Sequence, residues 1–203
     1  MEFSNEEKLN LVSKKMIAII RQSTEERVRS HSANKNFNLS EADPAFNTIN
    51  WPGKRASSIC ISSAALKINL TFYFSPDDVK KVAHQIYGKD APGELSDDQA
   101  QDFIKEFCNL SAGQLVNNFN NIGFSLEMGL PVCLNCVDNT DLDLTRVTGL
   151  ISKCEDLCCF SCEDCNMVMH SLIEIIDLDS LFPILNCEVS LNTELRSNEI
   201  DFL

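Results

Sequence analysis

The sequence predicts a single domain of the α/β (α+β) class, in which long helices pack on one face of a mainly antiparallel sheet. With 203 residues, the chain lies in the size range of one domain that buries a substantial core. Apolar residues make up 44% and charged residues 23% of the sequence, as in ordinary globular proteins. Helical and strand-like patterns are clustered instead of strictly alternating, which favours this architecture over a parallel sheet. We expect one domain over residues 1–203.

An excess of acidic residues limits the partners that this chain can bind. The 30 acidic and 17 basic residues give a formal net charge of −13, which repels nucleic-acid backbones and anionic lipid head groups. We therefore expect neither nucleic acid nor a membrane surface as a partner. The apolar stretch Met16–Ile20 is too short for a membrane span, and no cleavage-type sequence follows it. Ten cysteines without an export signal indicate a reducing compartment, so we expect a cytoplasmic protein.

The first half of the chain contains two helical patterns and two strand-like runs. Residues 6–30 carry apolar side chains at spacings of three and four, which predicts a long amphipathic helix. The polar stretch 31–54 is rich in Asn and Ser and is expected to form a long loop or arm. Ser57–Ala65 and Leu66–Phe74 read as neighbouring strands. A helix over 76–87 follows, because a capping serine, a proline and two aspartates begin it.

The second half begins with a long helix and continues with strands. Ser96 and Gln99 form a capping-box pattern that opens a helix extending to about Asn121. Further β-type runs follow at Phe124–Val137, Asp156–Cys162 and Met167–Ile176, and Leu181–Val189 is expected to be a last strand or an irregular segment.

One face of the helix after Ser96 carries a row of polar residues and a glycine. Asp102, Glu106, Asn109 and Gly113 are spaced by three and four residues, so they lie on a single face. Apolar residues surround this row and are expected to anchor the helix in the core. The row, called the stripe below, is therefore expected to point outward. By itself, such a stripe is more often an ordinary solvated helix face than a site.

The stripe resembles the motif of the CheC/CheX/FliY family of response-regulator phosphatases. Members carry Asp or Ser, three residues, Glu, two residues, Asn and, after about 22 further residues, Pro. Here Asp102, Glu106 and Asn109 have this spacing, and 21 residues separate Asn109 from Pro131. This resemblance implies a CheC/CheX-like fold.

The surroundings of the motif extend the resemblance. Residues 109–113 look like the family's Asn-x-x-Ala-Gly, and residues 130–132 look like its Leu-Pro-x strand start. The resemblance covers residues 95–135 and extends loosely to 57–88. It does not cover the stretch 31–54 or the cysteine-rich tail.

The resemblance implies a phosphatase that hydrolyses the aspartyl phosphate of a CheY-like receiver domain, in chemotaxis or related two-component signalling. Asn109 would hold the attacking water in line with the phosphorus, and Glu106 would pair with the receiver's lysine. Asp102 would be a support or a rim contact. Gly113 would let the partner's backbone approach, or would instead relieve helix–strand packing. The Mg²⁺ of such a reaction would belong to the receiver, so no cofactor and no catalytic metal are expected on this chain.

Some relatives carry a second motif on the first helix. Glu7 and Asn10 have the right spacing here, but Phe3 stands where Asp or Ser is expected, and no proline lies near residue 33. We interpret this match as chance. A single site makes the chain more similar to CheX than to CheC, and the resemblance to CheX implies a homodimer.

Two other hypotheses remain open from the sequence. The stripe could dock a receiver, or a second copy, without catalysis. The chain could also be a cysteine-rich metal-binding or redox-sensing protein, because several cysteines have ligand-like spacings. They are Cys133, Cys136, Cys154, Cys158, Cys159, Cys162 and Cys165. Against a metal site, no glycine-rich knuckle surrounds them, and Cys133 and Cys136 would lie on opposite faces of a strand, so a thiol-rich core competes with it.

Overall fold

Three α-helices and one 3₁₀ helix are present in the part of the chain that the structure, a computed structural model, describes. That part comprises residues 3–31, 38–41, 55–87, 95–135, 149–162 and 165–186. The helices are α1 (Asn5–His31), α2 (Pro76–Tyr87), α3 (Asp97–Asn121) and the 3₁₀ helix η3 (Asp179–Asn186). None of the described helices combines the length and the apolar composition that a membrane span requires.

Seven strands among the described residues form one sheet, and all their pairings are antiparallel. The strands are β1 (Asn38–Glu41), β2 (Arg55–Ser62), β3 (Leu66–Phe74), β4 (Glu127–Met128), β5 (Val132–Asn135), β6 (Ser152–Cys162) and β7 (Cys165–Ile175). Their order is β1-β6-β7-β3-β2-β4, and β5 also pairs with β2. The antiparallel sheet and its helices confirm the predicted fold class.

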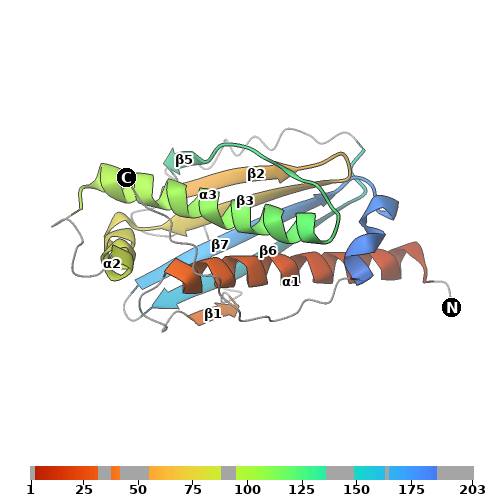
Figure 1. The fold of residues 1–203 in the computed structure, drawn as a ribbon, viewed down its shortest axis with the longest axis horizontal. Coiled ribbons are helices and arrows are strands. Elements are labelled where there is room, and N and C mark those ends of the chain that lie inside the picture. Colours follow the sequence, from red (N-terminus) through yellow and green to blue (C-terminus); the bar gives the residue numbers. More distant parts are fainter. Residues whose placement is uncertain are drawn as a thin grey trace.

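The core lies between one face of this sheet and the two long helices. On β3, Leu66, Ile68, Leu70, Phe72 and Phe74 are all fully buried in the main core, as the alternation of the strand requires. Figure 1 shows α1 and α3 side by side across this face, running in opposite directions. α3 contacts β2 and β3, whereas α1 contacts β6 and β7. Each long helix therefore covers its own half of the sheet.

Most predicted elements are found, with three corrections. Within the expected loop at 31–54, residues 38–41 form the short edge strand β1, paired with β6. The run Phe124–Val137 is not one strand, because a segment with Gly129 and Pro131 separates β4 from β5. Leu181–Val189 begins within the 3₁₀ helix η3 instead of a strand. Its buried Leu181 and Ile184 are three residues apart, which is the period of a 3₁₀ helix.

The other parts of these predictions fall on residues that the structure does not describe. They include the rest of the predicted arm, 32–37 and 42–54, and the ends of two predicted strand-like segments, 136–137 and 187–189.

Candidate functional site

The helix that carries the stripe, α3, begins with the capping box expected from the sequence. The backbone N–H of Gln99 donates to Ser96 Oγ at 3.2 Å, and the backbone N–H of Ser96 donates to Gln99 Oε1 at 2.9 Å. These two bonds satisfy backbone donors that a helix start leaves without partners. The first turn of α3 is therefore fixed by its own sequence.

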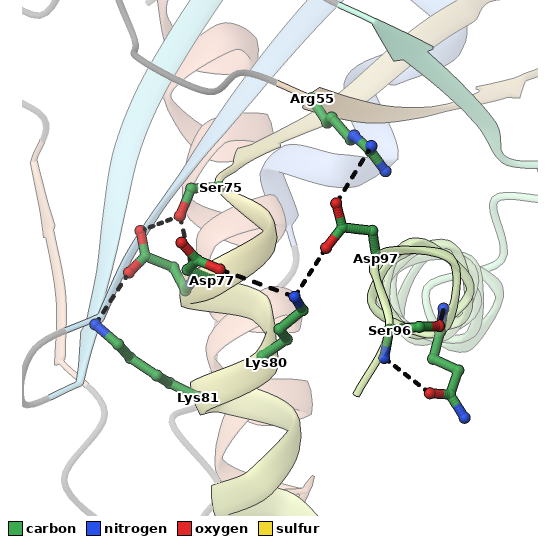
Figure 2. A network of polar contacts seen from close by, with 9 residues as sticks. Arg55, Ser75, Asp77, Lys80, Lys81, Ser96 and Asp97 are labelled. Atoms are coloured by element: carbon green, nitrogen blue, oxygen red, sulfur yellow. Dashed lines mark hydrogen bonds and ion pairs between the residues drawn. The ribbon is translucent and has the colours of Figure 1, made fainter. Parts of the chain in front are cut away.

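A polar network ties the same end of α3 to α2 and β2 (Figure 2). One Asp97 carboxylate oxygen accepts from Lys80 Nζ at 2.8 Å, and the other lies 3.8 Å from Arg55 Nη2. The hydrogen bond and the charge of Lys80 lower the pKa of Asp97. Because the Asp97 side chain is 54% exposed, water screens these pairs, so they orient the helix more than they stabilise the fold.

The other end of α3 stops at a glycine in the left-handed region. Gly123 has φ 79°, and its N–H donates to the carbonyl of Asn120 at 2.9 Å. The N–H of Phe124 reaches back to the carbonyl of Phe119 at 2.9 Å, and the two rings lie 5.9 Å apart. This is a Schellman ending with its apolar contact. Both ends of the helix are thus specified locally.

The inner face of α3 fixes the rotation of the helix about its axis. Phe107 packs edge-on against Phe72 of β3, with ring centroids 5.2 Å apart. Cys108 Sγ lies 3.9 Å from the carbonyl oxygen of Ser57 on β2, and burial raises the pKa of this thiol to about 12. The buried residues of the helix are Ala100, Ile104, Phe107, Cys108, Ser111, Ala112, Leu115 and Phe119. Their packing turns the opposite face toward solvent.

That opposite face presents the stripe, as the sequence predicted. Asp102 and Glu106 are exposed, whereas Asn109 and Gly113 are half-buried. Asp102 forms an ion pair with Lys105 of the same helix at 3.2 Å. Among the described residues, no side-chain hydrogen bond engages Glu106 or Asn109, and the Asn109 amide is not one of the buried polar atoms without a partner. An amide and a carboxylate, one turn apart, are therefore available to another molecule.

Gly113 stands in open space. A Cβ atom built on this residue would meet no heavy atom within 4 Å, whereas one on Gly129 would lie 3.2 Å from the carbonyl oxygen of Cys60. The packing of α3 on the sheet therefore does not require glycine at position 113. Of the two roles considered for Gly113, close approach of a partner's backbone remains a prediction, and relief of helix–strand packing is not supported.

A polar seam joins α3 to α1, and it brings an unpredicted residue close to the stripe. Asn118 Nδ2 donates to Ser23 Oγ at 2.8 Å, and Gln114 Nε2 donates to Glu26 Oε2 at 3.3 Å. Arg27, the next residue of α1, is half-buried; burial lowers its pKa, and the negative charge of Glu106 opposes that shift. Sequence reasoning missed Arg27. The sequence pattern that could have revealed it is its spacing: Arg27 continues the row of residues 16, 20 and 23, which lies on the side of α1 that faces the core.

The similar pair on α1 has a different role. Ser4 N–H donates to Glu7 Oε2 at 2.8 Å, and Glu7 N–H donates to Ser4 Oγ at 3.2 Å. Glu7 thus completes the capping box at the start of α1, and these hydrogen bonds lower its pKa. Asn10 is exposed one turn later. This structural role for Glu7 supports the interpretation of the Glu7/Asn10 match as chance.

Six cysteines whose side chains the structure describes are free: Cys60, Cys108, Cys133, Cys154, Cys158 and Cys159. Cys154 and Cys158 are four residues apart on β6, or about 13 Å at the usual rise of a strand. Cys133 lies on β5, and β7, β3 and β2 separate that strand from β6, which is about 19 Å at the usual spacing. Within the described part of the chain, no group of three or more His, Cys, Asp or Glu is placed to hold a metal ion. Cys136 and the side chains of Cys162 and Cys165 lie outside it.

Comparison with solved structures places this arrangement among known folds. A chain of the CheX–CheY–BeF3–Mg complex of Borrelia burgdorferi matches with a TM-score of 0.58 at 12% identity, covering 78% of this chain and 97% of that chain. This chain has the CheX-like fold. A CheC-like superfamily protein of Shewanella sp. PV-4 matches with a TM-score of 0.55 at 14% identity, covering 79% of this chain and 97% of its own.

FliY of Thermotoga maritima has the same fold, with a TM-score of 0.54 at 14% identity over 91% of this chain and 98% of that chain. No protein-family model and no curated protein sequence matches the chain. The CheC/CheX/FliY resemblance inferred from residues 95–135 is thus confirmed as a likeness of fold. Identities this low show a shared fold and no more.

Proposed function

We propose that this chain is a protein-aspartyl-phosphate phosphatase of the CheX type, acting on a phosphorylated receiver domain in chemotaxis or related two-component signalling. The observation that carries the proposal is the outward stripe, in which Glu106 and Asn109 make no side-chain hydrogen bond within the described residues. A mid-helix amide beside a carboxylate suits a reaction that needs a positioned water and little covalent chemistry.

In the proposed mechanism, Asn109 enters the receiver's site and its Oδ1 accepts a hydrogen bond from the attacking water. An amide cannot act as a base at neutral pH, so its contribution is to hold that water in line with the phosphorus. Glu106, one turn earlier, pairs with a cation of the receiver and fixes the orientation by a charge-assisted bond. Asp102 contributes at the rim. The Mg²⁺ belongs to the receiver, so this chain supplies positioning and orientation only.

The rigidity of α3 supports this mechanism. Catalysis by positioning requires that the group does not move relative to the reacting atoms, because small displacements cost large factors in rate. The capping box at Ser96, the ending at Gly123 and the edge-on contact of Phe107 hold the helix at both ends and at its centre. Asn109 therefore projects from a fixed support.

The partner that we propose is a CheY-like receiver. The Borrelia burgdorferi CheX structure that shares this fold is a complex with CheY, BeF3 and Mg²⁺. We further propose that the chain is cytoplasmic and forms a homodimer, in line with its thiol content and its CheX-like character.

A non-catalytic docking module is the second candidate. Asp102 and Glu106 are exposed, while Asn109 is only half-exposed, which favours contacts made by the carboxylates over those made by the amide. Such a module would bind a receiver, or a second copy, through the same stripe. It would leave the acyl phosphate intact.

The lifetime of the acyl phosphate separates the candidates. Receivers from the same cell are phosphorylated with a small phosphodonor, and the decay of each is followed with and without a substoichiometric amount of this protein. The phosphatase shortens the lifetime of at least one receiver in proportion to the protein added. Unchanged lifetimes for every receiver would overturn the proposal, and binding with unchanged lifetimes would establish the docking module.

A further inference from the structure

Three exposed apolar side chains follow one another along the edge of the sheet beside α3. The exposed fractions are 42% for Met128, 85% for Leu130 and 55% for Val132. Single apolar residues are common on protein surfaces, whereas several within five positions of one strand edge indicate a contact surface. The proposed mechanism at Glu106 and Asn109 makes no use of these three residues, which are called the apolar edge below.

The backbone that carries the apolar edge is an unpaired strand edge in the described part of the chain. β4 and β5 both pair with β2, and neither has a second strand neighbour among the described residues. Met128 pairs with Ile61. Four residues later, Val132 pairs with Ser58, so four steps along the edge match three along β2. The extra residue forms a β-bulge next to Leu130, which makes this edge a poor template for another strand and leaves its side chains as the contact groups.

The contacts of α3 place the apolar edge close to Asn109. Cys108 Sγ lies 3.9 Å from the carbonyl oxygen of Ser57, and Ser57 is the direct partner of Cys133 on β5. β5 therefore passes α3 at the level of Cys108, the residue before Asn109. The chain reaches this point from the end of α3 through β4 (Figure 1). Leu130 precedes Cys133 by three residues, so it lies within about 10 Å of it along the strand.

The rotation of α3 turns Asn109 toward the same flank of the helix. α3 meets α1 through hydrogen bonds of Gln114 and Asn118. At about 100° per residue, Asn109 lies about 140° around the helix from Gln114 and about 180° from Asn118. Asn109 therefore points away from α1, on the flank where α3 contacts β4 and β5.

The stripe by itself is too small for a protein interface. From Asp102 to Gly113 it runs about 17 Å along a helix about 10 Å wide, which offers about 170 Å². A protein interface of standard size covers about 800 Å² on each partner. A receiver that places its acyl phosphate at Asn109 therefore also covers surface beside α3. On the flank away from α1, that surface is the apolar edge.

We propose that the apolar edge is part of the receiver interface, where it contacts apolar side chains that adjoin the receiver's phosphorylated aspartate. This inference rests on the proposed function and names the surface that gives that site its affinity. Removing apolar surface from water favours association without directional requirements, so the apolar edge contributes affinity while the stripe contributes orientation and chemistry. A second copy of the chain is the alternative occupant, which the experiments distinguish.

A matched control lies elsewhere on the surface. Leu150 is 44% exposed and precedes β6, and β7, β3 and β2 separate β6 from the strands of the apolar edge. Leu130→Ser and Leu150→Ser therefore remove the same apolar side chain from two exposed positions, one close to Asn109 and one far from it. Because both side chains are exposed in the fold, both variants should keep the thermal midpoint of the wild type within a few degrees.

The first test locates the contact whether or not the protein is a phosphatase. ¹³C-methyl spectra of the full chain, labelled at Met and Leu, are recorded alone and with a receiver loaded with beryllofluoride. The methyl signals of Met128 and Leu130 shift when the receiver is added, and those of Leu150 stay in place. A receiver that binds without shifting the signals of Met128 and Leu130 would overturn the inference.

The second test separates affinity from chemistry. Leu130→Ser raises the KM for dephosphorylation about tenfold with little change in kcat, and Leu150→Ser changes KM by less than about twofold. Equal KM values for wild type and Leu130→Ser would overturn the inference and leave the proposed function in place. Receivers that bind with unchanged acyl-phosphate lifetimes would overturn the phosphatase, and the spectra would still decide the contact. A protein that binds no receiver would overturn both.

The third test identifies the alternative occupant. Sedimentation measures the oligomeric state of wild type, Leu130→Ser and Leu150→Ser, and we expect the same state for all three. A dimer that dissociates only in Leu130→Ser, with receiver affinity unchanged, would assign the apolar edge to a second copy and overturn the inference.

Discussion

The two long helices of this protein carry similar residues and use them differently. α1, with 27 residues, and α3, with 25, lie side by side on the same face of the sheet, and each contains Glu followed by Asn three residues later. Glu7 lies in the first turn of α1 and closes its capping box with Ser4. Glu106 lies in the middle of α3, away from both caps. Position within a helix, and not the spacing alone, decides whether such a pair is available to a partner.

The largest expected effect comes from the two asparagines. Asn109→Ala should lower the stimulated dephosphorylation rate of a receiver by about 10²-fold or more, because the water loses its positioning group. Asn10→Ala on α1 should leave that rate unchanged. The measurement is the decay of the acyl phosphate with equal amounts of each variant. Comparable losses in both variants would mean that the two helices are not functionally distinct.

The two glutamates should separate affinity from stability. Glu106→Ala should weaken receiver binding about 10- to 100-fold, the cost of a lost charge-assisted bond, with the thermal midpoint of unfolding nearly unchanged. Glu7→Ala should lower the thermal midpoint of unfolding, because it opens the cap of α1. It should leave receiver affinity nearly unchanged, because the stripe stays intact. Isothermal titration and thermal unfolding of both variants provide the comparison. A loss of receiver affinity in Glu7→Ala would reinstate a second site on α1.

A smaller effect is expected at Gly113, where one substitution should raise the stability of the fold and weaken receiver binding. Alanine is the better helix former and meets no atom here, so Gly113→Ala should stabilise the fold by about 0.5–1 kcal/mol. If a partner's backbone approaches this position, the same change should weaken receiver binding. Denaturant unfolding measures the change in stability, and the KM for dephosphorylation measures the change in receiver binding. Increased stability with unchanged KM would remove Gly113 from the interface.

The smallest expected effect is the pH dependence of the stability that Glu7 of α1 contributes. The folded-state pKa of Glu7 is lowered below its usual value of 4.5, so its contribution to stability is present above that value and disappears as the pH falls through the folded pKa. The difference in unfolding midpoint between wild type and Glu7→Ala should therefore shrink between pH 7 and pH 3. A difference that grows on acidification would show that the capping box does not hold the carboxylate.

Local signals explain why the functional helix could be predicted from the sequence. The start of α3 at Ser96, its end before Gly123 and the outward position of residues 102, 106, 109 and 113 depend on residues within a few positions of one another. Capping boxes and spacings of three and four are visible in a sequence because they act over one helical turn. The CheX-like fold followed from the same segment.

Features that depend on distant pairing were missed. The strand β1 is only four residues long, Asn38–Glu41, and it pairs with β6, which is more than a hundred positions away in the sequence. The place of Arg27 beside the stripe depends on the register of α1 against α3, which hydrogen bonds between residues nearly a hundred positions apart determine. Neither the pairing of β1 with β6 nor the register of α1 against α3 can be predicted from a short stretch of sequence.

The most direct test of the central claim measures binding and chemistry on one receiver. Wild type and Asn109→Ala are compared for their affinity for the receiver loaded with a stable phosphoryl mimic, and for the single-turnover loss of its acyl phosphate at saturation. We predict affinities within about twofold and a rate about 10²-fold lower in the variant. Equal rates at saturation would contradict the proposal that the outward amide of Asn109 positions the attacking water.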